Sequence, residues 1–575
     1  MGDWFAAAQK ADAGPVVDEI PFLSRRSPVL CRNGCVASSQ PLASSIGLDL
    51  LRKGANAAEA AIAVAAALSV VEPCSTGLGG DMFCLYYNSK ERSVSAINGS
   101  GCSPSQLTME VAKADCDDGK GAIDAVKFQA SPHAVTVPGA ARGYEDVWKR
   151  HGSGKFTLAE LLEPAAVLAE EGFPVSPVTA YHWKSGMHLI KRWLDDGEVV
   201  PLLAENGPNP GDIIVNKDMA RVLRDLGAKG ATEGFYEGET GKAIAAAVQK
   251  HGGKLSIDDL KSHTSTFPEP VSTEYRGVRL WEVPPNGQGV AALVALTGLR
   301  HLEENNLCPE LSPATVGKTA DAYHALIEMS RLGFEDARAQ VACPYHTKVP
   351  NEWFVDQDRI GKRAKELFNP QRAMAKGVPS PSSCTVSFQV ADKDGNAISF
   401  VNSNFMGFGS GIVPRGCGFS LQNRGFGFTL DDIEHPNCLA AGKRPYHTII
   451  PAMLTYADTN ELHSTISNMG GNMQPQGHLQ LTIDMVAGGM DPQQAIDNPR
   501  FCITDGTRDG KIFMEGGLDE TILKELTEKG HDLKVNVVGH DRAVFGRAQI
   551  IKRDRKTGVY WAGSDGRADG CAMGY

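Results

Sequence analysis

The sequence lacks the features of several protein classes. Only 13 of its 575 residues are cysteine, far below the density of a disulfide scaffold. The closest pair, Cys31 and Cys35, has no second pair at the spacing of a zinc site. The most apolar stretch, residues 60–71, is too short to cross a bilayer, and the N-terminus shows no signal peptide. These absences predict a cytoplasmic protein without a membrane partner.

An excess of positive charge is also missing. The chain has 57 Lys and Arg against 68 Asp and Glu, which gives a net charge of −11 and argues against nucleic acid as a partner. Residues 424–428 (RGFGF) resemble part of an RNA-stacking strand, but Thr429 and Asp431 stand where that motif requires aliphatic and aromatic residues. We therefore interpret this segment as a glycine-aromatic strand of a sheet.

Common catalytic and metal-binding motifs are absent. The sequence contains no HExxH and no GxSxG motif. His182 and His188 are six residues apart, so they would not lie on the same face of a helix as two metal ligands must. The glycine runs at 77–82 and 407–412 have neither GxGxxG spacing nor a P-loop lysine, so we expect turns that require positive φ. No metal ion or organic cofactor is expected.

What is present is ordinary globular composition, with 42% hydrophobic and 22% charged residues. The length predicts either two to four domains or one large sandwich. Residues 1–29 are predicted to form a loose N-terminal arm. Glycine at 54 is predicted to end a helix, and Asn56 with Glu59 forms a capping box at the start of a buried, alanine-rich helix.

A proline- and serine-rich segment, residues 367–384, is the best linker candidate and leads directly into a predicted β-hairpin. With Asp394 at the centre of its turn, Thr385 should lie opposite Ser403. Further along, Gly470-Gly471 separates a predicted strand from a helix N-terminus, where free backbone N–H groups can hold an anion. Composition alone is equally consistent with a purely structural interpretation. In that interpretation Thr385 merely favours a strand, Ser403 is a polar residue at a strand end, and Gly470-Gly471 forms a turn.

These residues fall in blocks that resemble the γ-glutamyltranspeptidase family of N-terminal-nucleophile hydrolases. The hairpin TVSFQVADKDGNAISFVNS is similar to the start of the family's small subunit, and EPCSTGLGGDMFCLYYN, YRGVRLWEVPPNGQG, GKRPYHTIIPAM and SNMGGNMQPQ are similar to further blocks in family order. The resemblance covers roughly residues 30–575 and points to the glutathione hydrolase-like branch. It implies an α+β fold, a four-layer αββα sandwich made as an inactive precursor.

The resemblance also implies a chemistry. The precursor would cut itself between Cys384 and Thr385, leaving a large part (30–384, preceded by the arm) associated with a small part (385–575). The freed amine of Thr385, with an ordinary pKa of about 7.7–8.0, would serve as the base for its own hydroxyl. Gly470 and Gly471 would hold the oxyanion, and Ser403 would orient the nucleophile.

Specificity departs from the family pattern. The positions that bind a γ-glutamyl group in glutathione-cleaving members are occupied here by Ser100, Phe405, Gly427 and the pair His447-Thr448. Each of the two lost charged contacts would remove about 1.5–3 kcal/mol of binding free energy. We therefore expect poor γ-glutamyl binding unless Arg424, with Asn423, contacts a substrate carboxylate. The sequence thus predicts a self-processing amidohydrolase for γ-glutamyl or related small acyl amides. An oxamate- or acylase-type amidohydrolase and a non-catalytic scaffold are the alternatives.

Overall fold

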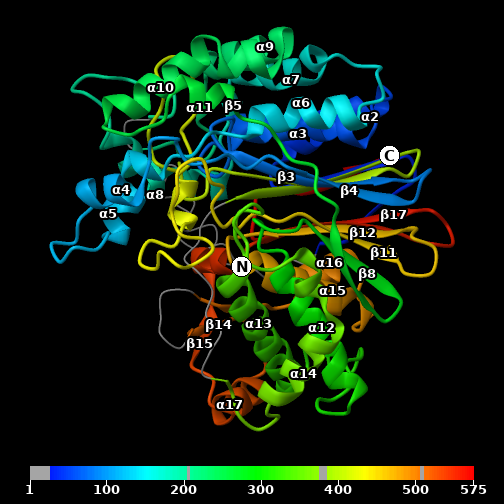
Figure 1. Cartoon of the computed structure of the whole chain (residues 1–575). Helices are drawn as coiled ribbons and strands as arrows, with labels where there is room; N and C mark the ends of the chain where they lie inside the picture. Colours follow the sequence, from blue (N-terminus) through cyan, green and yellow to red (C-terminus); the bar gives the residue numbers. More distant parts are fainter. Residues whose placement is uncertain (1–25, 204–206, 375–384, 505–509) are drawn as a thin grey trace, which may run out of the picture.

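The computed structural model describes residues 26–203, 207–374, 385–504 and 510–575. It consists of four layers, in which two sheets lie face to face in the centre and helices cover both outer faces (Figure 1). The predicted α+β, αββα sandwich is confirmed. Most of the arm predicted at residues 1–29, and the cleavage-site residue Cys384, lie outside the described residues.

The first sheet contains the predicted hairpin at its centre. In spatial order its strands are β18 (Cys571–Gly574), β2 (Gly34–Ser38), β9 (Val386–Asp392), β10 (Ala397–Ser403), β3 (Asp81–Asn88) and β4 (Ser93–Asn98). Within the hairpin Asn402 pairs with Val386 and Ala397 with Ala391, so the predicted register is confirmed. At the turn, Asp392 accepts hydrogen bonds from the backbone N–H groups of Asp394 and Asn396.

The second sheet has seven strands and provides the Gly-Gly loop. In spatial order these are β1 (Val29–Cys31), β17 (Tyr560–Ser564), β16 (Arg547–Arg553), β12 (Leu462–Met469), β11 (Ala452–Tyr456), β8 (Val278–Glu282) and β7 (Val271–Tyr275). Beside it, β13 (Phe501–Ile503), β14 (Ile512–Glu515) and β15 (Leu533–Val537) form a small separate sheet. Strand β12 ends immediately before Gly470.

Helices pack on the two outer faces. The six-stranded sheet is covered by α2 (Pro41–Arg52), α3 (Ala57–Val71), α6 (Ala140–His151), α7 (Leu158–Glu171), α8 (Pro177–Lys191), α9 (Lys217–Ala231), α10 (Glu239–Lys250) and α11 (Ile257–Lys261), with α4 (Met109–Asp115) and α5 (Ala125–Ala130) to one side. The seven-stranded sheet is covered by α12 (Val290–Glu304), α13 (Ala320–Gln340), α14 (Gln357–Leu367), α15 (Met473–Val486), α16 (Pro492–Asp497) and α17 (Glu520–Glu528). The predicted capping box of Asn56 and Glu59 is present, and every residue of α3 is buried.

Three apolar cores separate the four layers. One lies between the first sheet and its helices, and another lies between the second sheet and its helices. The third lies between the sheets, where Phe83 and Val401 of one sheet pack with Met453 and Ile551 of the other. Because each sheet is buried on both faces, polar groups in the central strands must be satisfied internally. The candidate site lies in this environment.

Two local predictions are wrong. Residues 424–427 form a short 3-10 helix instead of a strand. Of the two glycine runs predicted to need positive φ, the run at 407–412 is confirmed by Gly409 at +57° and Gly411 at +78°, whereas the glycines of 77–80 do not have positive φ. Gly80 is required because a Cβ there would collide with the carbonyl of Ser403. Close packing between segments distant in sequence therefore explains that glycine, rather than turn geometry.

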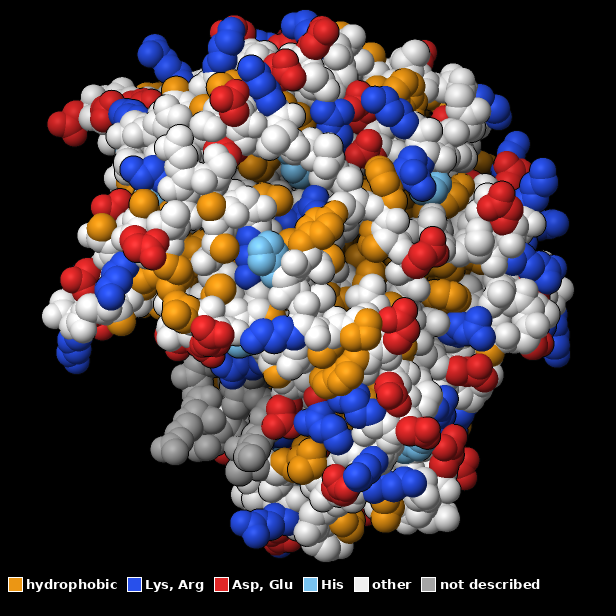
Figure 2. Space-filling view, in the orientation of Figure 1, with side chains coloured by type: hydrophobic (Ala, Val, Ile, Leu, Met, Phe, Trp, Pro, Cys, Tyr) orange, Lys and Arg blue, Asp and Glu red, His pale blue; other side chains and the backbone are white. Residues whose placement is uncertain are grey.

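No helix among the described residues is long and apolar enough to cross a bilayer. On the face shown in Figure 2, acidic and basic side chains are interspersed. The cytoplasmic location remains a prediction.

A buried ion cluster provides a test of stability. Glu515 at the end of β14 contacts the guanidinium groups of Arg542 and Arg567, and Asp565 pairs with Arg567 at 3.0 Å. Glu515→Gln removes a charge that two buried guanidinium groups share, so we expect the free energy of unfolding to fall by about 3–5 kcal/mol. Urea unfolding measures this change, with Glu520→Gln on the surface as the control. A change below about 0.5 kcal/mol would contradict the structural role.

Candidate active site

Thr385 lies immediately before β9, in the centre of the six-stranded sheet. Its side chain is fully buried, and its Oγ1 donates a hydrogen bond to Ser403 Oγ at 3.1 Å. The hairpin register places the two residues across from each other at the open end of β9 and β10. The hydroxyl predicted to be the nucleophile is thus held by the hydroxyl predicted to orient it.

Ser403 is the last residue of β10, and its hydroxyl takes part in several hydrogen bonds. Its Oγ also accepts hydrogen bonds from the backbone N–H of Phe405 at 2.8 Å and from Arg424 Nη2 at 3.2 Å. Phe405 has a φ of +75°, so the chain turns sharply directly after the strand. This turn brings the Phe405 amide back onto the serine hydroxyl.

Arg424 is buried beside these hydroxyls, and no carboxylate of the described residues is in direct contact with it. Its Nη1 donates to Thr448 Oγ1 at 2.7 Å, and its guanidinium carbon lies 4.3 Å from the centre of the Phe405 ring. Among the described residues its Nε has no hydrogen-bond partner, and no carboxylate oxygen lies within ion-pair distance. Burial lowers the pKa of Arg424 to about 9, and the negative charge of Asp81 opposes this shift. A buried cation of this kind favours an anionic ligand.

Asp81 and His447 form a buried pair near Arg424. Both side chains are fully buried, and His447 Nε2 lies 3.0 Å from Asp81 Oδ2. Because His447 Nδ1 accepts from the backbone N–H of Ile449, the imidazole proton is on Nε2 and points to Asp81. Burial, followed by the charge of Arg424, lowers the pKa of His447 well below its ordinary value, which keeps the ring neutral.

The Gly-Gly loop contains two backbone amides that no described residue accepts from. Gly470 and Gly471 follow β12 and precede α15, with φ values of +129° and +59° that favour glycine. Among the described residues, neither N–H donates a hydrogen bond. The side-chain amide of Gln288 donates hydrogen bonds to the carbonyls of Gly471 and Thr448, at 2.9 and 2.7 Å. It therefore connects the Gly-Gly loop to Thr448, whose hydroxyl accepts a hydrogen bond from Arg424.

The remaining predicted positions have other local contacts. Asn423 accepts from the Met406 backbone N–H at 3.3 Å, next to Arg424. Ser100 is buried and donates to Asn98 at 2.7 Å, and the carbonyl of Gly427 accepts from Asn437 at 2.7 Å. The structure thus groups Thr385, Ser403, Arg424 and Thr448 by direct hydrogen bonds, while His447 contacts Asp81 instead.

Sequence reasoning missed Asp81 and Gln288. Both lie in blocks that contain glycine, GLGGDM and PPNGQG, and neither block has the spacing of a phosphate-binding motif. For Asp81 the available signal was a polar residue directly after a glycine run, at the start of a buried strand, and for Gln288 it was a polar residue between two glycines just before helix α12. Their contacts to residues 366 and 183 positions away could not be derived from that signal.

Comparison with known proteins places the chain in a family. The family model described as Gamma-glutamyltranspeptidase matches residues 43–575. The glutathione hydrolase-like YwrD proenzyme of Bacillus subtilis (strain 168) is 34% identical, covering 94% of this chain and 98% of that protein. The oxamate amidohydrolase proenzyme of Klebsiella pneumoniae is 30% identical, with the same two coverages.

A solved structure supports the same assignment. The crystal structure of cephalosporin acylase from Bacillus halodurans matches with a TM-score of 0.85 and 37% identity, and covers 98% of this chain and 99% of that one. The relatives are hydrolases and acylases, and the match extends along nearly the whole chain. The chain therefore belongs to the γ-glutamyltranspeptidase family and is an N-terminal-nucleophile hydrolase.

Proposed function

We propose that the chain is a self-processing threonine amidohydrolase that cleaves small amides with a carboxylate close to the scissile bond. The observation that carries this proposal is the direct contact chain from Thr385 Oγ1 to Ser403 Oγ and on to the Arg424 guanidinium. A packing role alone requires neither the two facing hydroxyls nor a buried cation beside them.

The first reaction is the cut before Thr385. The Thr385 hydroxyl attacks the carbonyl carbon of Cys384, and the peptide C–N bond breaks as the acyl group moves from nitrogen to oxygen. Water then hydrolyses the ester, which leaves a carboxylate on Cys384 and a free amine on Thr385. The association of the two fragments is supported by the continuous sheet, since β9 of the small part pairs with β2 of the large part.

The second reaction uses the freed amine. The amine accepts the hydroxyl proton of Thr385 while Oγ1 attacks the substrate's amide carbonyl, and the tetrahedral oxyanion is held by the N–H groups of Gly470 and Gly471. Collapse expels the protonated amine and leaves an acyl ester on Thr385. Water or an acceptor amine then releases the acyl group. Gln288, by holding the Gly471 carbonyl, keeps the two amides in position.

The position of Arg424 favours a short acyl group. Only the Ser403 hydroxyl separates the guanidinium from Thr385 Oγ1. An amide whose carboxylate is adjacent to the scissile carbonyl, as in oxamate, reaches both groups at once. A γ-glutamyl carboxylate is three carbons further from its amide, and Gly427 offers no side chain to bind the α-amine. Asn423, Thr448 and His447 would complete the surroundings of the carboxylate.

Intact mass and substrate preference test this proposal. We expect the purified wild-type protein to contain fragments of about 41 and 20 kDa, in proportion to residues 1–384 and 385–575 of the 61.4 kDa chain, with Thr385 at the new N-terminus. We also expect a higher kcat/KM for oxamate than for a γ-glutamyl anilide. An uncut chain without amidase activity would favour the non-catalytic scaffold, and the reverse substrate preference would favour a glutathione hydrolase.

The titration of Asp81 predicts a pH dependence of substrate affinity. Burial raises the pKa of this carboxyl to about 7, while Arg424 opposes the shift. Below pH 7 the protonated, neutral Asp81 does not repel a substrate carboxylate; above pH 7 its charge competes for Arg424. The KM for a carboxylate-bearing amide should therefore rise as the pH increases through about 7.

Kinetics of wild type and Asp81→Asn check this result. The variant should show a KM without the rise near neutral pH, and an amide that lacks the carboxylate should show a flat KM in both proteins. The same rise in Asp81→Asn would assign the titration to another group.

A further inference from the structure

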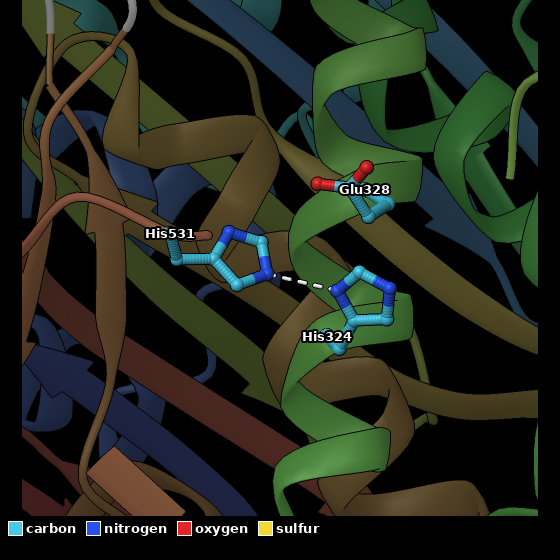
Figure 3. Close-up of side chains that lie close together, drawn as sticks. All are labelled: His324, Glu328 and His531. Carbon is cyan, nitrogen blue, oxygen red and sulfur yellow. Dashed lines mark hydrogen bonds between the residues drawn. The ribbon is translucent and has the colours of Figure 1, made fainter. Parts of the chain in front are cut away.

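A second cluster of buried polar side chains lies in the helical layer that covers the seven-stranded sheet. His324 and Glu328 are four residues apart on α13 and so share a helix face, and His531 comes from the turn between α17 and β15 (Figure 3). One ligand atom from each of the three lies within 4.8 Å of the others, and all three side chains are buried. The proposed reaction uses none of them.

One imidazole lone pair faces the interior of this cluster. His324 Nε2 donates to the carbonyl of Asn369 at 2.8 Å, so Nδ1 carries a lone pair and accepts from His531 Nε2 at 2.8 Å. A metal ion bound between the two rings would take the place of this proton, and His531 would then carry its proton on Nδ1, which has no hydrogen-bond partner among the described residues. A ring N–H bound to a backbone carbonyl is the arrangement that orients metal-binding histidines.

Glu328 is held in a similar way. Its Oε2 accepts from the Met374 backbone N–H at 2.6 Å. Its Oε1 has no hydrogen-bond partner among the described residues, and the same is true of His531 Nδ1. The cluster therefore contains buried polar atoms whose hydrogen-bonding capacity is unused, which costs free energy unless a ligand satisfies it.

We propose that His324, Glu328 and His531 bind a divalent transition-metal ion, with Zn²⁺ as the best match. Two imidazoles and one carboxylate form a donor set that Zn²⁺ accepts, with water in the fourth position. Tetrahedral Zn–N bonds of about 2.0–2.1 Å require the two ring nitrogens to separate by about 0.5 Å more than they do here. Arg331 Nε lies 3.7 Å from Glu328 Oε1, and this positive charge weakens binding relative to a site without it.

The position of the cluster gives the metal a structural role. The cut proposed before Thr385 would leave His324 and Glu328 in the large fragment and His531 in the small fragment. His324 and Glu328 are hydrogen-bonded to Asn369 and Met374, which lie close to the end of the described part of the large fragment. A bound ion would therefore connect the two fragments after processing. This role rests on the proposed self-cleavage, whereas metal binding itself does not.

Metal binding to the full chain tests the site. After treatment with EDTA, wild-type protein is titrated with Zn²⁺ by calorimetry and with Co²⁺ by visible absorption. We expect one ion per chain and the intense bands of tetrahedral Co²⁺. His531→Gln and Glu328→Gln should each weaken binding by at least about 100-fold, since even residues that only orient ligands contribute about 10–100-fold. His188→Gln, which removes an exposed histidine elsewhere, should bind like wild type.

Two results would overturn the site: wild type that binds no ion, or variants that bind as wild type does. The wild-type titration needs no substitution, so misfolding of a variant does not remove the test. Thr385→Ala separates the two proposals, because an uncut chain that binds one ion retains the site even if processing fails. At free Zn²⁺ about 100 times the dissociation constant, association of processed fragments in urea should increase about 100-fold. Zinc-independent association would contradict the bridging role.

Discussion

Thr385→Ala is expected to leave a single chain of 61.4 kDa and to lower amide hydrolysis by at least about 10⁴-fold. Alanine removes the oxygen that attacks the Cys384 carbonyl, and without the cut no α-amine is released to act as the base. Removal of Thr385 Oγ1 alone therefore abolishes both self-cleavage and amide hydrolysis. Mass spectrometry of the purified protein and a discontinuous amidase assay measure the two losses separately.

Thr385→Ser is the matched control, because it retains the hydroxyl and removes only a methyl group. It should be cut, more slowly than wild type, and should retain measurable hydrolysis. Ser403→Ala, which removes the hydrogen-bond partner at 3.1 Å, should slow both reactions without abolishing them. Normal cleavage of Thr385→Ala would assign the nucleophile to another residue.

Arg424→Met is expected to lower kcat/KM for carboxylate-bearing amides by about 30- to 1,000-fold, mainly through a higher KM. The substitution keeps much of the side-chain volume beside Phe405 but removes the buried charge and the hydrogen bonds to Ser403 and Thr448. A substrate carboxylate would then be desolvated without a partner. Steady-state kinetics with oxamate measures this loss.

A neutral amide of the same size distinguishes substrate binding from damage to the site. Arg424→Met should reduce its hydrolysis by a much smaller factor, because that substrate does not require the charge. Arg424→Lys should recover part of the affinity for oxamate, since it retains the charge but not the two-pronged geometry of the guanidinium. Equal losses on both substrates would indicate that Arg424 only positions Ser403.

Local patterns were sufficient for several parts of the fold. The alternation around Asp394 predicted the hairpin register, and Asn56 with Glu59 predicted the capping box of α3. In both cases the interactions join residues at most 18 positions apart, so one short segment of the sequence contains both partners. The four-layer arrangement came instead from resemblance to a family, because spacing alone does not determine how two sheets pack.

The surroundings of the candidate nucleophile depend on contacts that local patterns do not describe. Residues 424–427 were expected in a strand, yet they form a 3-10 helix that places Arg424 against Ser403 and Thr448. No periodicity predicts this position, because it results from the packing of a glycine-rich loop against the end of β10.

By itself, the sequence determined the hairpin that positions Thr385 opposite Ser403 and the Gly-Gly turn at the end of a strand, since backbone hydrogen bonds and φ preferences act over a few residues. Only the tertiary structure decided which distant groups meet: Asp81 with His447 and Gln288 with Gly471 at this site, and His324 with His531, 207 positions apart, in the helical layer. Burial is the physical reason. Once the sheets and helices exclude water, each polar group must be satisfied by whichever partner the packing brings near.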